Sequence, residues 1–188
     1  MDRHVAVRHL LEHLRPDDLL LTTTGMISRE AFYTDDRPAT FYMIGSMGLA
    51  SSFGLGLAMV HPARRIIVVD GDGSFLMSLG TAPLVAYEAP RNLHHVVLDN
   101  ASYQSTGAQP SISTRIDLAP IAEAAGYRSV VSADDLESLD RALDELLGSP
   151  GPTLLHVRVN ISEVEGIPRV SHTPEEIRDR FLKEAMAS

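Results

Sequence analysis

Two stretches of the sequence decide the fold: Ile66-Ile67-Val68-Val69-Asp70-Gly71-Asp72-Gly73-Ser74 and His95-Val96-Val97-Leu98-Asp99-Asn100. Each is an apolar run with the length of a buried parallel strand, and each ends in polar residues. The segment between them, from Ser74 to about Glu88, has the pattern of a helix. Because a strand, a helix and a second strand build a parallel sheet, the two polar ends should lie side by side. One end offers a carboxylate and the other an amide, and such oxygen ligands can hold a divalent cation against a diphosphate.

The rest of the chain predicts further strands and helices in alternation. The expected strands are residues 19–21, 41–44, 66–69, 96–98, 129–131 and 154–159. The expected helices are 2–14, a short one from Ser28, 47–60, 74–88, 118–125, 133–147 and 174–186. Pro83 should kink or split the helix in which it lies. This order predicts an α/β fold, with a doubly wound, mostly parallel sheet and helices on both faces.

The length of 188 residues favours one domain. We expect that domain to span 1–188, with a core of about 17–160 and a C-terminal extension, 161–188, that carries the last helix. The residues from Met47 to Val60 are small and apolar almost all round, which predicts a buried helix whose glycines allow close packing.

The composition excludes several classes of function. The net charge is −9 with no basic cluster, so we expect neither nucleic acid nor an anionic membrane as a partner. The sequence shows no membrane span and no signal peptide, so a cytoplasmic location is the default expectation. There is no cysteine and a single lysine, Lys183, which argues against thiolate, cysteine-held cluster and Schiff-base chemistry. Any demanding chemistry should therefore belong to a cofactor held without a covalent bond.

The motif Gly71-Asp72-Gly73-Ser74 has two interpretations. It can be an ordinary strand-to-helix turn with serine as the N-cap. It can also be a site where glycines let the backbone approach a diphosphate and Asp72 binds the bridging cation. It is neither a Walker loop, which needs a lysine, nor a dinucleotide fingerprint, whose spacing differs.

Asn100 favours the second interpretation, because it follows the motif after one helix and one strand. The combination resembles the thiamine diphosphate-binding motif, and the fold is expected to be that of its diphosphate-binding domain. The resemblance implies that Asp72 and Asn100 bind Mg²⁺ through their side chains and Ser102 through its carbonyl, with Ser74 contacting the diphosphate. The family commonly has two asparagines where this chain has Asp99-Asn100, and the ligand position is the second.

The turn Gly45-Ser46-Met47-Gly48 taken alone is a tight turn with a core methionine. The resemblance implies two catalytic contacts here: Met47 wedges between the two cofactor rings, and the Gly45 carbonyl accepts from the 4′-amino group. The full set of implied cofactor-binding residues is Thr24, Gly25, Gly45, Ser46, Met47, Gly71, Asp72, Gly73, Ser74, Asn100, Ser102, Tyr103, Gln104 and Ser105.

The loop from Asn100 to Gln109 and the segment 41–48 are similar to sulfopyruvate and phosphonopyruvate decarboxylases. The similarity covers about residues 19–131, and the Ser-Thr-Gly-x-Gln element at 105–109 is its most specific part. Family members often have glycine at the position of Ala108. The resemblance implies decarboxylation of a 3-anionic pyruvate to an aldehyde and carbon dioxide. An acetolactate synthase-like carboligase and a non-catalytic cofactor-binding or regulatory subunit are the alternatives.

The residues that could contact the substrate each have two possible roles. Ser105, Thr106 and Gln109 can contact the substrate or can form a hydrogen-bonded loop. Arg29 or Arg37 can face the second anion, because guanidinium suits sulfonate and phosphonate, or can hold an interdomain ion pair. Two histidines, His94 and His95, are expected to be structural, at the start of a strand far from its carboxyl end.

The resemblance also implies a partner. In this family, a glutamate from a second domain activates the cofactor, and no residue of this chain fits that role. We therefore expect this to be the diphosphate-binding (beta) subunit. A pyrimidine-binding (alpha) subunit on a separate chain would complete a hetero-oligomer such as α2β2 or a larger one.

Overall fold

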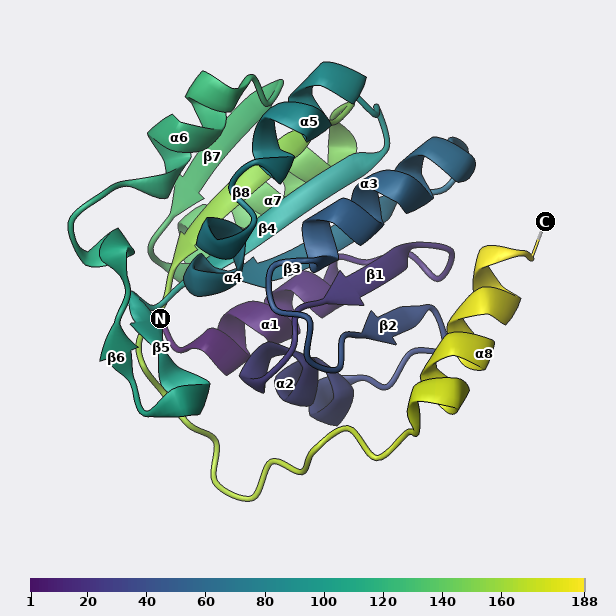
Figure 1. The fold of residues 1–188 in the computed structure, drawn as a ribbon, viewed down its shortest axis with the longest axis horizontal. Helices are drawn as coiled ribbons and strands as arrows, with labels where there is room; N and C mark the ends of the chain where they lie inside the picture. Colours follow the sequence, from purple (N-terminus) through teal and green to yellow (C-terminus); the bar gives the residue numbers. More distant parts are fainter. Residues whose placement is uncertain (188) are drawn as a thin grey trace.

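A six-stranded parallel sheet forms the centre of the computed structural model, which describes residues 1–187 (Figure 1). The strand order is β2-β1-β3-β4-β8-β7. The strands are β1 (Leu19–Thr22), β2 (Thr40–Tyr42), β3 (Ile66–Gly71), β4 (Leu93–Asp99), β7 (Ser129–Ala133) and β8 (Thr153–Arg158). A separate antiparallel pair joins β5 (Ser102–Tyr103) to β6 (Gln109–Pro110). The expected α/β fold is confirmed.

Helices cover both faces of this sheet. On one face lie α1 (Arg3–Glu12), α2 (Met26–Thr34) and α7 (Leu136–Gly148), and on the other lie α3 (Ala50–Val60), α4 (Asp72–Met77), α5 (Thr81–Glu88) and α6 (Leu118–Ala125). The last helix, α8 (Pro174–Ala185), lies beside the edge strand β2. Two short 3-10 helices, η1 (Gln104–Thr106) and η2 (Ile112–Thr114), follow β4.

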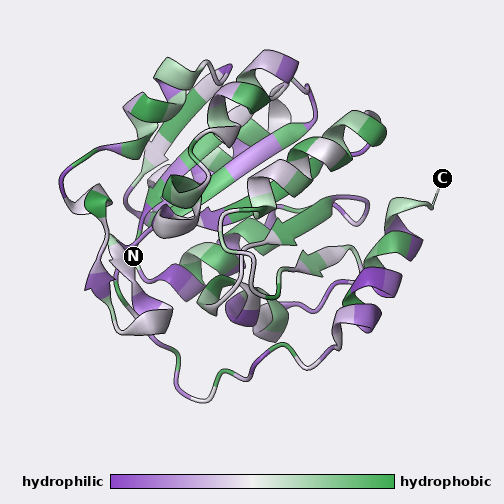
Figure 2. Ribbon diagram, in the orientation of Figure 1, coloured by the Kyte–Doolittle hydropathy of each residue, from purple (hydrophilic) through white to green (hydrophobic). Residues whose placement is uncertain are grey.

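The core is divided by the sheet because neighbouring residues of a strand face opposite sides. Ile67 and Val69 of β3 pack with α1, α2 and α7, whereas Ile66 and Val68 pack with α3, α5 and α6. Figure 2 shows the central strands as largely hydrophobic, apart from a hydrophilic stretch near the start of β4, as expected for strands buried on both faces. Helices α1 and α8, which flank the expected core range of 17–160, also contribute buried side chains to these two clusters.

The helix predicted at 74–88 is split into α4 and α5, as Pro83 suggested. The break comes at residues 78–80, so that Pro83 falls in the first turn of α5, where its missing N–H costs nothing. The helix predicted from residue 133 begins instead at Leu136, because Asp135 caps it and forms a capping box with Ser138. The prediction for α3 is only partly right. Gly54 packs against Val68 as expected, but Met59 and Val60 are exposed.

The chain order creates a switch point between β1 and β3. From β1 the chain passes through α2 to β2 on one side, while β3 pairs with β1 on its other side. Ligands of doubly wound sheets bind at such a point, beyond the carboxyl ends of the strands. Within residues 1–187, no helix combines the length and apolar character needed to cross a membrane.

Candidate functional site

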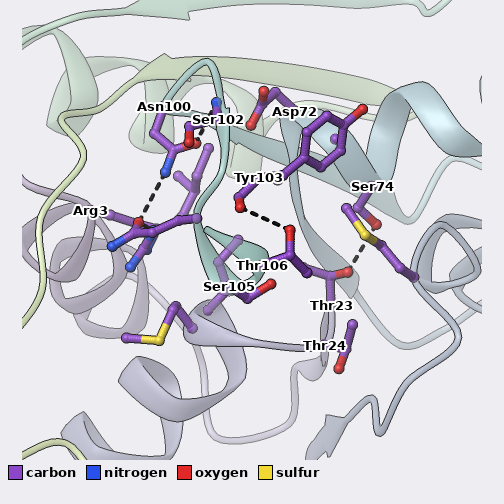
Figure 3. A pocket seen from close by; sticks show the side chains of 17 residues that line it. Arg3, Thr23, Thr24, Asp72, Ser74, Asn100, Ser102, Tyr103, Ser105 and Thr106 are labelled. Carbon is purple, nitrogen blue, oxygen red and sulfur yellow. Dashed lines mark hydrogen bonds between the residues drawn. The ribbon is translucent and has the colours of Figure 1, made fainter. Parts of the chain in front are cut away.

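A cavity of about 100 Å³ lies at this switch point, at the carboxyl ends of β1, β3 and β4 (Figure 3). The predicted site residues that line it are Thr24, Met47, Gly71, Asp72, Gly73, Ser74, Asn100, Ser102, Tyr103, Gln104, Ser105 and Thr106. The predicted residues that do not line it are Gly25, Gly45, Ser46, Gln109 and Arg29. Residues as far apart in the sequence as Thr24 and Thr106 are thus brought to one place, as the parallel strand pairing predicts.

Asp72 is a buried carboxylate without a cationic partner. It is the first residue of α4 and only 2% exposed. Its side-chain hydrogen bonds come from Ser111 and Ser113, and none of the ion pairs of residues 1–187 includes it. Burial and the nearby charge of Asp99 raise the pKa of Asp72. Buried charges in proteins are normally paired or bind metals, so this carboxylate fits a cation.

The neighbouring Asp99 shows the contrasting case. One of its oxygens accepts from His156 and Arg158, both at 2.8 Å, and the other accepts from Ser113 at 2.8 Å and from the Ala101 amide at 2.9 Å. Burial acts to raise the pKa of Asp99, but these donors outweigh it and the pKa is lowered. Both carboxylate oxygens of Asp99 therefore have hydrogen-bond donors within the chain.

Asn100 is held in one orientation by two contacts. Its Oδ1 accepts from the Ser102 amide at 3.1 Å, and its Nδ2 donates to Gln104 Oε1 at 3.1 Å. Gln104 in turn accepts from Arg3, whose guanidinium is paired with the buried Glu30 at 2.7 Å and 2.9 Å. A fixed asparagine oxygen beside Asp72 is compatible with the predicted cation ligand set.

The hydroxyl of Ser74 is used within the chain. It donates to Asp70 at 2.5 Å and accepts from the Gly48 amide at 3.0 Å, and it lies 2.9 Å from the hydroxyl of Thr23. These contacts tie together the ends of β1 and β3 and the turn before α3. Ser74 lines the cavity as predicted, but its side chain serves first to join these three segments.

Gly73 has to be glycine because there is no room for a Cβ atom at this position. Its φ is not positive, but an added Cβ would lie 2.5 Å from the ring of Tyr103 and 2.9 Å from Met47 Cε. Met47 stands in the predicted turn, where Gly45, Ser46 and Gly48 all have positive φ. The Met47 side chain lies close to the glycine motif, and its role as a wedge between the cofactor rings stays a prediction.

The other predicted contacts are arranged as follows. Thr24 accepts from the Gly45 amide at 3.1 Å and so links two strand ends. Gly25 has a φ of 95° and precedes α2. Ser102 contributes a buried hydroxyl that has no hydrogen-bond partner among the described residues. An unpartnered hydroxyl in the wall of a cavity is an additional sign of a polar ligand.

The candidate substrate residues separate into two groups. Ser105 and Thr106 line the cavity, whereas the side chain of Gln109 folds back on Thr106 and is exposed. Arg29 lines a neighbouring cavity with Glu163 and Glu165.

Arg37 is not a substrate candidate, which corrects one of the two options above. It donates to the carbonyls of Arg15, Pro16 and Asp18, away from the carboxyl ends of the strands.

Ala108, in the loop after Asn100, takes the left-handed conformation with a φ of 56°, which glycine adopts more readily than alanine.

The predicted position of His94 and His95 relative to their strand needs a correction. Strand β4 begins at Leu93, so both histidines lie within it. His94 contacts the hydroxyl of Thr153 at 2.9 Å. His95 reaches Asp70 at 3.0 Å, whose other oxygen accepts from Ser74, so His95 is linked to the cavity wall through one carboxylate.

Four polar contributors were not predicted: Arg3, Thr23, Ser111 and Ser113. Arg3 lies on the helix predicted at 2–14, and no local signal reveals its buried partner. Thr23 belongs to the hydroxyl-rich turn after β1, which was an available signal. Ser111 and Ser113 lie in a polar loop, and only the tertiary fold brings them to Asp72.

Among residues 1–187, no three acidic, histidine or cysteine side chains converge to hold a metal ion. A cation at Asp72 would therefore depend on amide and carbonyl oxygens as well, and Asn100 and Ser102 supply these groups at the same cavity.

Comparisons with known proteins agree with this geometry. Residues 23–157 match the family described as thiamine pyrophosphate enzyme, C-terminal TPP binding domain. Phosphonopyruvate decarboxylase of Streptomyces viridochromogenes is 44% identical over 179 residues, which are 95% of this chain and 45% of that protein. Sulfopyruvate decarboxylase subunit beta of Methanothermobacter thermautotrophicus is 42% identical over 168 residues, which are 89% of this chain and 87% of that subunit.

The fold is also shared with a solved structure. Benzoylformate decarboxylase from Polynucleobacter necessarius superposes with a TM-score of 0.77 at 17% identity, over 87% of this chain and 34% of that one. The chain thus spans less than half the length of the Streptomyces relative and most of the length of the Methanothermobacter subunit.

Proposed function

Because the chain belongs to the thiamine pyrophosphate enzymes, as their C-terminal TPP-binding domain, we propose that it is the diphosphate-binding subunit of a 2-oxo acid decarboxylase. The substrate would be a 3-anionic pyruvate, and the products would be the corresponding aldehyde and carbon dioxide. The observation that carries the proposal is the buried carboxylate of Asp72, which has no cationic partner within residues 1–187 and lies beside Asn100 at the switch point. The decarboxylase names of the two relatives favour this reaction over carboligation.

The residues of this chain would hold the cofactor and its cation. The side chains of Asp72 and Asn100 and the carbonyl of Ser102 would bind Mg²⁺. Gly71 and Gly73 carry no side chain that would keep a diphosphate from the backbone. When bound, thiamine diphosphate supplies the electron sink that decarboxylation needs.

Three further roles concern the reacting end of the cofactor. Met47 would shape the cofactor by packing between its rings, and the Gly45 carbonyl would accept from the 4′-amino group. Ser105 and Thr106, which line the same cavity, would contact the substrate. Arg29 faces a cavity that also contains Glu163 and Glu165, so we do not assign it to the substrate anion.

The activating glutamate would come from a pyrimidine-binding subunit on another chain. One observation supports this part of the proposal: the Methanothermobacter relative, of which the matched residues cover 87%, is named a beta subunit. The assembly would be a hetero-oligomer in which the cavity described here forms one wall of the complete site.

The test is to co-express the chain with the product of the adjacent gene and to assay sulfopyruvate, phosphonopyruvate and pyruvate. We expect aldehyde release from one of the anionic pyruvates, dependent on thiamine diphosphate, Mg²⁺ and both chains. Formation of a condensed acid from pyruvate would instead identify a carboligase. Tight cofactor binding without turnover of any of the three would identify a non-catalytic subunit.

A further inference from the structure

Two serines hold Asp72 by one of its carboxylate oxygens. Ser111 Oγ donates to Asp72 Oδ2, and Ser113 Oγ lies 3.2 Å from the same oxygen. Both serines are buried: Ser111 is the N-cap of η2, and Ser113 is the middle residue of that helix. Among the side chains of residues 1–187, none hydrogen-bonds the other oxygen, Oδ1. Side chains of the protein therefore hold Oδ2 of Asp72, whereas Oδ1 has no side-chain donor among the described residues and can bind another group.

The two serine hydroxyls make more contacts than they have protons to donate. The Oγ atoms of Ser111 and Ser113 lie 2.8 Å apart, and Ser113 Oγ is also 2.8 Å from Asp99 Oδ1. Each serine has one proton to donate, so two protons serve four contacts. Ser113 is nearer to Asp99 than to Asp72, and Ser111 is the principal donor to Asp72. Removing either hydroxyl leaves a buried carboxylate oxygen short of a donor.

Orientation and charge are therefore supplied separately at this site. The charge of Asp99 is offset by the guanidinium of Arg158, and His156 adds a hydrogen bond. The charge of Asp72 is not offset by either serine, since hydroxyls are neutral. The serines can fix the carboxylate, but the compensating charge must come from a bound cation.

We propose that Ser111 and Ser113 are positioning residues for Asp72. They hold Oδ2 so that Oδ1 is presented to the cation that accompanies the diphosphate. This inference rests on the proposed function, because that function supplies the cation. Partners of metal-binding carboxylates typically change metal affinity about 10- to 100-fold when they are removed.

The experiment measures binding and needs no turnover. Equilibrium dialysis of the full chain, alone and with its partner, gives the Mg²⁺ concentration at which half of the chain holds thiamine diphosphate. The variants are Ser111→Ala, Ser113→Ala and the conservative Ser113→Thr, which keeps the hydroxyl. Ser132→Ala is the matched control, because Ser132 is exposed on β7. The unfolding midpoint in EDTA is measured for each variant.

We expect Ser111→Ala and Ser113→Ala each to raise the required Mg²⁺ concentration about 10-fold or more, with Ser113→Thr close to wild type. The unfolding midpoint in EDTA should not follow this order, which separates positioning from a purely structural role. Unchanged Mg²⁺ dependence in both alanine variants, with normal binding by wild type, would overturn the inference alone. Absence of Mg²⁺-dependent binding in wild type would overturn the proposed function as well. If an alanine variant fails to fold, the other alanine variant and Ser113→Thr decide by the same measure.

Discussion

The two ends of the sheet both bury carboxylates, but Asp18 at the amino end has a cationic partner and Asp72 at the carboxyl end has none among the described residues. At the amino end, Asp18 precedes β1 and is paired with Arg65, which precedes β3 and also donates to the Leu147 carbonyl at 2.8 Å. Asn92, before β4, donates to three carbonyls, those of Ala58, His61 and Arg64. At this end Asp18, Arg65 and Asn92 all find their partners within the chain.

At the carboxyl end, Asp72 has hydroxyl donors but no positive charge, and the hydroxyl of Ser102 has no partner within the described part of the chain. Burial alone therefore does not separate a structural carboxylate from a functional one, since both Asp18 and Asp72 are buried. What separates them is whether the fold itself supplies the opposite charge. Changes at the two ends should accordingly affect different properties.

The largest effect is expected for Asp72→Ala. It should weaken Mg²⁺-dependent thiamine diphosphate binding by more than about 100-fold, because it removes a proposed ligand and not merely a supporting partner. Its free energy of unfolding without Mg²⁺ should not fall, since an uncompensated buried charge is removed. Isothermal titration and urea denaturation measure the two quantities. Undiminished cofactor binding by Asp72→Ala would show that Asp72, like Asp18, is not a cation ligand.

Arg65→Met should have the reverse profile. It leaves the buried Asp18 without its cation, so the free energy of unfolding should fall by about 3–5 kcal/mol. Cofactor affinity of the folded protein should be unchanged, since Arg65 lies at the opposite end of the strands. Arg8→Met is the control, because Arg8 pairs only with Glu12 at the surface of α1, and we expect a change below about 0.5 kcal/mol. Equal losses of unfolding free energy in the two variants would show that the buried Arg65–Asp18 pair stabilises the fold no more than a surface pair does.

His94 provides a pH test of the amino end. Burial, and then the charge of Arg65, lower the pKa of His94 to about 4 from an ordinary 6.5. The unfolded chain therefore binds a proton below pH 6.5 that the folded chain refuses until about pH 4. Stability should be full above pH 6.5 and should fall by about 3 kcal/mol as the pH is lowered to 4.

The His94→Gln variant should lose that part of the pH dependence, as measured by urea denaturation at a series of pH values. Since other groups titrate in the same range, the comparison is the difference between the two curves. Parallel curves between pH 4 and 6.5 would contradict the neutral, buried state of His94.

The smallest effect is expected for Gly73→Ala, compared with Gly56→Ala. The added methyl group at position 73 would meet Tyr103 and Met47, and such overpacking costs about 1–3 kcal/mol. At position 56, on exposed α3 surface, nothing lies within 4 Å of the new Cβ. That substitution should stabilise the helix by about 0.5–1 kcal/mol. Thermal unfolding of the two variants should therefore shift in opposite directions, and shifts of the same sign would contradict the close approach at Gly73.

The sequence predicted the fold well because its strands are apolar runs that end in polar motifs. The pairing of β3 with β4 followed from a strand, a helix and a strand in succession, and it placed Asp72 beside Asn100. The split of the helix before Pro83 followed from the missing N–H of proline. These features depend on local pattern and on the rules of parallel sheets.

What could not be predicted depends on contacts between distant segments. Arg3 reaches the cavity only because α1 packs beside α2, where Glu30 lies buried. Ser111 and Ser113 reach Asp72 because the loop after β4 folds back to the first residue of α4. His95 was placed too far from the site, because β4 begins earlier than its apolar run suggested and its side chain reaches across to Asp70.

The most direct test of the central claim is to locate the cation. Crystals of the full chain with its partner, grown with thiamine diphosphate and Mn²⁺ in place of Mg²⁺, would give an anomalous difference peak at the metal. We predict one peak at about 2 Å from a carboxylate oxygen of Asp72, Asn100 Oδ1 and the Ser102 carbonyl, in contact with the diphosphate. Cofactor bound in this cavity with its metal away from Asp72 and Asn100 would contradict the account.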